Sequence, residues 1–368
     1  KIKRKNKLGG CFKMFQNVLM NNDGAKIIVI GVGGGGGNAL NCIVTEGIKG
    51  NIDYVAVNTD LQALSRSQAT QPIQIGPKLT SGLGAGGNPE VGEQSAQENK
   101  DEIAEAIKDC NMVFITAGMG GGTGTGAAPI VAEIAKELGK LTVAVVTKPF
   151  AFEGKRKMDQ AEKGIKKLLD NVDSLIVIPN QKLMDNDAKI TMRQAYSMAD
   201  DVLKTGVKSI ADLILRDGFI NVDFADVTSI MKSAGYAHMS MGHGQGKEKA
   251  KDAAKQVITS PLLETSIKGA RRLLLNVVMS DDVTTVDLAE LTDLLTNEAD
   301  PNANIITGVD YIEDATDEIY VTVIASDFVD FDNGSKEDSG NAEALMNAGV
   351  KAPGNTDLYD NIFGILNS

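Results

Sequence analysis

Residues 118–129, about a third of the way along the chain, carry the clearest chemical pattern in the sequence. They read Gly-Met-Gly-Gly-Gly-Thr-Gly-Thr-Gly-Ala-Ala-Pro and lie between the apolar run 112–115 and a helical pattern. A strand, a glycine loop and a helix start bring backbone N–H groups to one point, where the helix N-terminus adds positive partial charge. The loop is therefore predicted to bind phosphate oxygens, with two threonine hydroxyls as further donors. The alternative is a close-packed turn that binds nothing.

Two other glycine-rich segments, 31–37 and 81–89, precede this loop. The first satisfies Gly-x-Gly-x-x-Gly, which alone is a weak dinucleotide signal, and the Walker phosphate loop is absent from the sequence. None of residues 31–47, 79–99 or 116–135 is Lys or Arg. The phosphates are therefore predicted to be held by amide dipoles, with a divalent cation, most naturally Mg²⁺, screening their remaining charge.

Composition narrows the class of protein. The 368 residues allow two domains, and the net charge of −12 argues against nucleic acid as a partner. Three cysteines are too few for a disulfide framework or a metal knuckle, which indicates a reduced, cytoplasmic compartment. No run of eighteen apolar residues occurs, so direct membrane insertion is not expected. The basic first residues, which lack an initial Met, indicate an over-extended or fragmentary start, or else a disordered arm.

From residue 26 the pattern alternates between strands and helices. Strands are predicted at 26–32, 54–59, 72–75, 112–115, 141–146 and 174–178, with helices from about 38 and over 89–108. This alternation predicts a mostly parallel sheet covered on both faces, with ligands at the carboxyl ends of the strands. A long helix at 191–216 follows. After it come helical stretches 223–232, 247–257 and 286–295 and strands 273–279, 305–311 and 318–324 of a smaller mixed domain.

The predicted fold class is thus α/β: a Rossmann-like parallel-sheet domain, a long central helix, a smaller α+β C-terminal domain and a disordered tail. The predicted divisions are an N-terminal extension 1–24, a nucleotide-binding domain 25–190, the central helix 191–218, the C-terminal domain 219–328, a flexible linker 329–356 and a docking peptide 357–368. In the last segment Leu358, Ile362, Ile365 and Leu366 share one helical face, which favours a docking peptide over a frayed tail.

Six segments in order carry a resemblance to a known family: GVGGGGGNALN, GLGAGGNPEVG, GGGTGTGAAP, PFAFEG, IVIPN and NVDFADV. Over about residues 24–327 the chain resembles the FtsZ family, the bacterial relatives of tubulin within the tubulin/FtsZ GTPase superfamily. The resemblance implies binding of GTP and GDP, hydrolysis of GTP with Mg²⁺, and head-to-tail polymerisation of the protein with itself. It further implies a place in the cytoplasmic mid-cell division ring, with division proteins and membrane tethers bound through the C-terminal peptide.

The resemblance also assigns roles to individual residues. Gly33, Gly34 and Gly35 would approach the phosphates, and Asn38 would lie by the guanine. The γ-phosphate would be closed over by Gly84, Ala85, Gly86 and Gly87, and the α- and β-phosphates would be held by Gly120, Gly121, Gly122, Thr123, Gly124 and Thr125. Glu153 would reach the ribose, and Asn180, Tyr196 and Asp200 would recognise guanine. A carboxylate suits the N1–H and N2–H donors of guanine, and an aromatic ring offers a stacking face.

A second group of residues, Asn221, Asp223 and Asp226, begins a predicted helix far along the chain. The two acids are three residues apart, so both carboxylates project from one side, although helix capping alone would explain one of them. In the resembling family this loop enters the nucleotide pocket of the next subunit, where the acids polarise the attacking water and help to place the cation. Hydrolysis would then depend on assembly.

Some positions depart from the family pattern. Lys157 stands where an arginine is usual, which puts its ribose or phosphate contact in doubt, because lysine lacks the bidentate fork.

His238 and His243 flank a Met-rich turn in this prediction, and no resident metal site is expected there. Two alternatives to a GTPase remain: a tubulin-like paralogue that assembles without hydrolysis, and a nicotinamide-dependent enzyme, which the signature loop disfavours.

Overall fold

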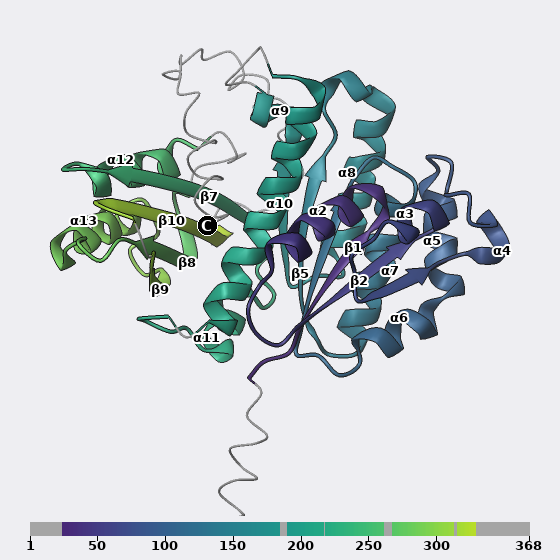
Figure 1. The fold of residues 1–368 in the computed structure, drawn as a ribbon, viewed down its shortest axis with the longest axis horizontal. Coiled ribbons are helices and arrows are strands. Elements are labelled where there is room, and N and C mark those ends of the chain that lie inside the picture. The colour runs from purple at the N-terminus through teal and green to yellow at the C-terminus, as the bar shows by residue number, and fades with distance from the viewer. Residues whose placement is uncertain (1–23, 185–189, 217, 261–266, 313–314, 329–368) are drawn as a thin grey trace, which may run out of the picture.

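The computed structural model describes residues 24–184, 190–216, 218–260, 267–312 and 315–328 (Figure 1). The predicted extension, apart from Gly24, and the whole of the predicted linker and docking peptide lie outside these residues.

One ten-stranded sheet runs through the molecule, in the order β3-β2-β1-β4-β5-β6-β7-β10-β8-β9. The first six strands pair in parallel, as predicted, whereas β10 pairs antiparallel with both β7 and β8. The strands are β1 (Ile27–Val32), β2 (Ile52–Asn58), β3 (Gln71–Gln74), β4 (Met112–Gly118), β5 (Leu141–Lys148), β6 (Ser174–Pro179), β7 (Gly235–Gln245), β8 (Ala270–Met279), β9 (Asn304–Tyr311) and β10 (Glu318–Phe328).

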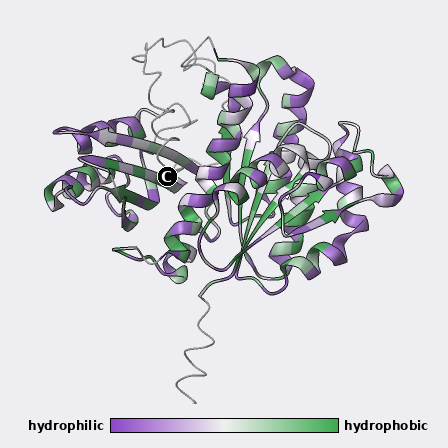
Figure 2. Ribbon diagram, viewed as in Figure 1, coloured by the Kyte–Doolittle hydropathy of each residue, from purple (hydrophilic) through white to green (hydrophobic). Residues whose placement is uncertain are grey.

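Helices cover both faces of the parallel part because its strands are apolar on both sides. Ile27 and Val29 pack towards α2 and α10, whereas Ile28 and Ile30 pack towards α6, α7 and α8. Figure 2 shows the apolar strands between helices with hydrophilic outer sides. The helices are α2 (Gly33–Glu46), α3 (Leu61–Ser65), α4 (Pro77–Thr80), α5 (Pro89–Glu98), α6 (Lys100–Ile107), α7 (Thr123–Glu137), the 3₁₀ turn η1 (Ala151–Glu153), α8 (Lys155–Leu169), α9 (Asn180–Met184), α10 (Met192–Leu215), α11 (Phe224–Met231), α12 (Lys249–Ile258) and α13 (Thr285–Thr296).

Helix α10 lies between the parallel and antiparallel parts of the sheet (Figure 1). Its buried residues Val202, Leu203, Val207 and Ile210 belong to one apolar core that extends from β1 to β8. Strand β7 continues the sheet by pairing in parallel with β6 at Ser174–Ile176. The proposed division into separate domains therefore crosses a continuous sheet, and its boundaries stay predictions.

Three sequence-based assignments are wrong. The predicted helix 89–108 is two helices, because Asn99 leaves the helical conformation and its side chain accepts the N–H of Gly76 at 2.9 Å. The predicted glycine loop 31–37 lies mostly within α2. The predicted Met-rich turn near His238 and His243 is strand β7, whose many Gly and Met residues obscured its alternation.

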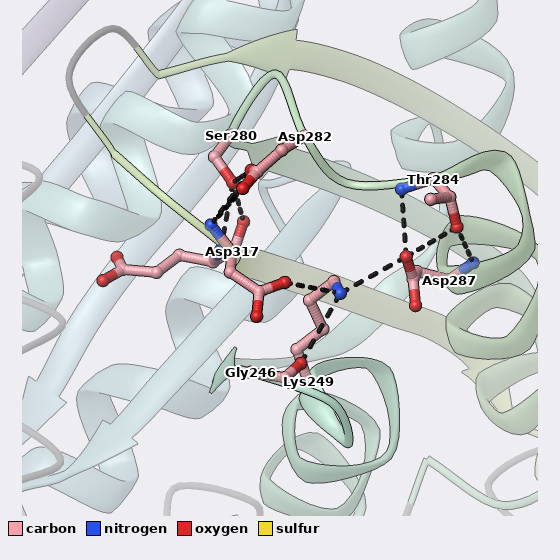
Figure 3. Close-up of polar contacts among 8 residues, drawn as sticks. Gly246, Lys249, Ser280, Asp282, Thr284, Asp287 and Asp317 are labelled. Carbon is pink, nitrogen blue, oxygen red and sulfur yellow. Dashed lines mark hydrogen bonds and ion pairs between the residues drawn. The ribbon is translucent and has the colours of Figure 1, made fainter.

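The antiparallel part is held by a polar cluster around Lys249 of α12 (Figure 3). The Lys249 ammonium lies 2.8 Å from Asp317 at the start of β10 and 3.3 Å from Asp287 in the first turn of α13. Asp287 in turn accepts the backbone N–H and the hydroxyl of Thr284. One cation thus joins three elements that are distant in sequence.

Candidate functional site

The two strongest glycine segments begin neighbouring helices at one edge of the sheet. Strands β1 and β4 pair directly in parallel; α2 follows β1 directly, and α7 follows β4 after the four residues 119–122. Helix α2 begins at Gly33, although glycine is a poor helix former. Its glycines allow close packing on β4: an added Cβ at Gly36 would lie 2.2 Å from the Thr116 carbonyl oxygen. The first N–H groups of both helices have no intrahelical acceptors, so they are available to an anion at this edge.

Close packing explains some of these glycines. A Cβ on Gly33, whose φ is +72°, would lie 2.7 Å from the Gly124 nitrogen. A Cβ on Gly124 would lie 2.6 Å from the Gly118 carbonyl oxygen, and one on Gly126 would lie 1.9 Å from that of Pro89. The alternative of a close-packed turn therefore accounts for part of the pattern.

Packing does not explain Gly34 or Gly121. A Cβ at either position would meet no atom within 4 Å, and neither residue has a positive φ. Both positions leave open space beside the two helix starts, where a side chain would obstruct a ligand. The residues present therefore fit a phosphate group brought close to the backbone.

The two threonines of the signature shape the loop from within. The Thr125 hydroxyl accepts the Gly120 N–H at 2.8 Å, and the Thr123 hydroxyl lies 2.7 Å from that of Thr59, the residue after β2. Thr59 is fully buried, and sequence reasoning missed it because nothing in its neighbourhood distinguishes it. The hydroxyls therefore fix the loop conformation.

The third glycine segment adjoins the signature loop. A Cβ on Gly122 would lie 2.8 Å from the Ala85 Cβ, and Gly84 donates its N–H to the Thr59 carbonyl at 3.3 Å. Gly84, Gly86 and Gly87 all have positive φ, a conformation that favours glycine. The structure thus brings the segments around β1, β3 and β4 together, as predicted from their positions after strands.

An aromatic cluster borders the same edge. Phe150 follows β5, stacks on Phe152 at 5.1 Å between ring centroids, and meets Tyr196 of α10 edge-on at 5.2 Å. Phe152 is 49% exposed and Tyr196 41% exposed, so both rings have free surface. The sequence contained Phe152 within a family motif, but its exposure could not be predicted.

Glu153 is already engaged by its neighbours. Its carboxylate accepts the Phe150 N–H at 3.0 Å and lies 3.0 Å from the Lys157 ammonium one helical turn later. Burial, and then the Glu153 charge, raise the pKa of Tyr196. Lys157 therefore pairs with Glu153 in this structure, and contacts of either residue with a nucleotide stay predictions.

Within the part of the chain that the structure describes, Asn180 has an unpartnered side-chain oxygen, and Asp200 has a desolvated carboxyl group. Asn180 directly follows β6, is 5% exposed, and its side-chain oxygen has no hydrogen-bond partner among the described residues. Burial, reinforced by the Asp201 charge, raises the pKa of Asp200 to about 7. Buried polar atoms are normally paired, so an acceptor and a desolvated carboxyl at one edge fit a ligand rich in donors. Asn38 is exposed one helical turn after Gly34, on the same face of α2.

The structure does not bring the acidic residues to this edge. Asn221, Asp223 and Asp226 follow the far end of α10, whose 24 residues span about 36 Å. The helix that they begin, α11, ends beside Ser174, the first residue of β6, whereas Asn180 follows the last residue of that strand. The glycine loops and the acids therefore lie at opposite edges of one sheet.

Asp223 also has a capping role, as the alternative interpretation predicted. It is the N-cap of α11, and its carboxylate accepts the Asp226 N–H at 2.7 Å. Asp226 is exposed in the first turn. A cap leaves the charge of Asp223 in place, so capping and a chemical role are compatible.

The described residues contain neither a candidate membrane-spanning helix nor a candidate metal-binding cluster. No helix there is both long and apolar enough to cross a bilayer. No cluster of three or more His, Cys, Asp or Glu side chains there could hold a metal ion. His243 instead stacks on Tyr320 at 4.3 Å, and His238 meets Phe328 edge-on.

Comparison with known proteins gives the same architecture. The model of the Tubulin/FtsZ family GTPase domain matches residues 26–187, and that of the FtsZ family C-terminal domain matches residues 235–329. An FtsZ dimer structure from M. jannaschii is similar at 43% identity and TM-score 0.80, over 86% of this chain and 92% of that one. CetZ1 from Haloferax volcanii, bound to GDP, shares the fold at 19% identity and TM-score 0.70, over 82% and 93% of the two chains.

CetZ2 from Haloferax volcanii, a GTPγS-bound protofilament, likewise shares the fold at 22% identity and TM-score 0.67, over 87% and 96% of the two chains. The family models match most of the chain, on both sides of α10. With the glycine loops gathered at one edge of the sheet and an FtsZ relative above 40% identity, the chain belongs to the FtsZ branch of the tubulin/FtsZ family of GTPases.

Proposed function

We propose that this GTPase forms head-to-tail filaments in which the nucleotide held by one subunit is hydrolysed against Asn221, Asp223 and Asp226 of the next. The observation that carries the proposal is the separation of the two half-sites at opposite edges of the sheet. Each chain carries both half-sites, but they are too far apart to meet within one subunit. A contact between the glycine-loop edge of one copy and the acidic edge of the next completes the site. Such a head-to-tail contact produces an open filament unless the rotation between subunits closes a ring.

On the nucleotide side the geometry of the described residues supports the proposed roles. The N–H groups at the starts of α2 and α7 bind phosphate oxygens, beside the open space at Gly34 and Gly121. Asn180 and Asp200 accept the donors of guanine, which would pair the Asn180 oxygen, unpartnered among the described residues, and favour the ionised form of the desolvated Asp200 carboxyl. Tyr196 offers its exposed ring for stacking, and Glu153 is proposed to contact the ribose.

On the acid side Asp223 and Asp226 orient the attacking water and accept its proton, with Asn221 as a further polar contact. Mg²⁺, when bound with the nucleotide, would neutralise charge on the phosphates. The glycine loops fit that need because 31–47, 79–99 and 116–135 contain no basic residue. Loss of the γ-phosphate changes the contact between subunits, so hydrolysis weakens the filament.

The dimer and protofilament forms of the relatives support self-association. We further propose a role in a cytoplasmic division ring at mid-cell, with division proteins and membrane tethers bound through residues 357–368. The domain organisation proposed above, with α10 as the connection between the two half-sites, accords with this arrangement.

Phosphate release measured against protein concentration tests the proposal. Turnover per molecule should be negligible in dilute protein and rise cooperatively where sedimentation with GTP, but not with GDP, first yields polymer. Turnover independent of concentration would contradict a shared site. Polymer without phosphate release would identify an assembling paralogue, and binding of NAD in preference to GTP would identify a nicotinamide enzyme.

A further inference from the structure

Helix α11 carries Asp223 and Asp226 at its first end, and its last end is held by side chains from two distant strands. The four carbonyl groups from Ser229 to Lys232 have no helical N–H partners, as at any helix end. In this structure all four are occupied by side-chain donors, as follows.

Arg272 of β8 supplies most of these contacts. One terminal nitrogen of its guanidinium lies 3.0 Å from the Lys232 carbonyl oxygen, 3.4 Å from that of Ser229 and 3.5 Å from that of Ile230. The hydroxyl of Ser174 donates to the remaining carbonyl, that of Met231, at 2.6 Å. A cation at a helix C-terminus also complements the helix dipole.

The guanidinium is itself fixed. Its Nε lies 3.1 Å from the Asp327 carboxylate on β10, the strand that pairs with β8. Asp327 has a φ of +58°, which is unusual for a residue other than glycine. Arg272 is therefore held between β10 and the end of α11 and has little freedom to move away.

The chain before α11 is tied to the same part of the sheet. Ile220 and Val309 of β9 exchange two backbone hydrogen bonds, of 3.0 and 3.1 Å. The acidic turn thus lies between a backbone bridge to β9 and a helix of eight residues, about 12 Å long, whose far end is fixed by β8. A shift at that far end moves Asp223 and Asp226 with it.

We infer that Arg272 is a positioning residue for hydrolysis: by binding the C-terminal carbonyls of α11, it sets where Asp223 and Asp226 meet the nucleotide of the adjoining subunit. This inference rests on the proposed function of the two acids. Displacements of about 1 Å can reduce catalysis by ~10²-fold even when the altered residue lies away from the chemistry.

The first test separates binding from turnover. Arg272→Gln should leave the GTP dissociation constant of dilute protein unchanged, while turnover in saturating GTP falls by about 10–100-fold. Arg272→Lys keeps the charge with fewer donors and should recover part of the loss. Lys251→Gln is the control, because Lys251 is exposed on α12 and pairs with Glu248 and Glu290, so its loss should leave turnover unchanged.

Mixing variants identifies the half-site that is damaged. Asp200→Ala, added in excess, lacks guanine binding but brings intact acids to the nucleotide of another subunit. Turnover of Arg272→Gln should therefore recover when it is mixed with Asp200→Ala, and should not recover with Asp226→Ala. A merely structural role for Arg272 would show no such selectivity.

The mixture of Asp226→Ala with Asp200→Ala tests the shared site independently. If that pair stays inactive, the proposed function fails. If that pair recovers but Arg272→Gln with Asp200→Ala does not, the inference about Arg272 is overturned. Should Arg272→Gln fold poorly, Asp327→Asn loosens the same guanidinium at nearly constant volume and should show the same recovery by mixing.

Discussion

The carboxylate of Asp223 accepts the backbone N–H of Asp226 at 2.7 Å, so the first of the two acids orients the turn that carries the second. A helix cap needs an oxygen acceptor, which an asparagine also supplies, whereas activation of water needs a charge. Substitutions at these two positions can therefore separate stability from chemistry.

Asp223→Asn should keep the cap and the free energy of unfolding while it removes the charge. Asp223→Ala should lose about 1 kcal/mol of stability as well. With both variants, and with Asp226→Asn, we expect phosphate release to fall by about 10²–10⁴-fold while GTP still binds. Denaturant unfolding, GTP binding and phosphate release check these outcomes, and near-normal turnover of Asp226→Asn would contradict the assignment.

Alanine substitutions should divide the glycines into two classes. Gly34→Ala and Gly121→Ala add a methyl group to open space, so the melting temperature of nucleotide-free protein should hardly change while GTP affinity drops. Gly126→Ala is the contrast, because its Cβ would lie 1.9 Å from the Pro89 carbonyl oxygen and should destabilise the fold itself. Normal GTP affinity in both the Gly34→Ala and Gly121→Ala variants would contradict phosphate binding beside these two residues.

GTP affinity should depend on pH through Asp200. Guanine donors favour the ionised carboxylate, and the pKa of this group without nucleotide is about 7, chiefly because of burial. Between pH 7 and pH 6 the affinity should therefore weaken, approaching tenfold per pH unit at lower pH. Binding titrations of the wild type and of Asp200→Asn check this, since the Asn variant should lose that dependence.

The same group predicts the pH dependence of stability without nucleotide. An unfolded Asp has a pKa near 4, so between about pH 4 and pH 7 the folded state holds the extra proton. The contribution of Asp200 is therefore full below pH 4 and is lost as the pH rises towards 7. Urea unfolding at pH 5.5 and 7.5 should show this loss in the wild type but not in Asp200→Asn.

Lys249→Met should destabilise the antiparallel part of the sheet. The Lys249 side chain packs against its neighbours, its ammonium lies within 3.3 Å of both Asp287 and Asp317, and its removal leaves the two carboxylates without this counter-charge. We expect a loss of about 1–3 kcal/mol. Lys251→Met is the matched control on the same helix, because its pairs with Glu248 and Glu290 are exposed to solvent and their loss should hardly change the free energy of unfolding. Equal effects in denaturant unfolding would contradict a special role for Lys249.

Sequence alone predicted the alternating strands, the parallel sheet and the gathering of glycine loops at its carboxyl edge. These features depend on local apolar runs and on chain direction, both of which can be recognised in the sequence. It was less successful where contacts between elements outweigh local preference. Helix α2 includes several glycines because its backbone packs directly against β4, with no room for a side chain at Gly36. The helix that begins at Pro89 ends where the Asn99 side chain accepts the N–H of Gly76.

By itself the sequence determined which residue types could bind phosphates and guanine, because glycine, amide and carboxyl groups have their chemistry in any fold. Only the tertiary structure decided which glycines are needed for packing and which leave open space, since that depends on the atoms of other elements. It also decided that the acids lie across the sheet from the glycine loops, with Arg272 at the far end of their helix. Distances between segments far apart in the chain arise from packing, and no local pattern encodes them.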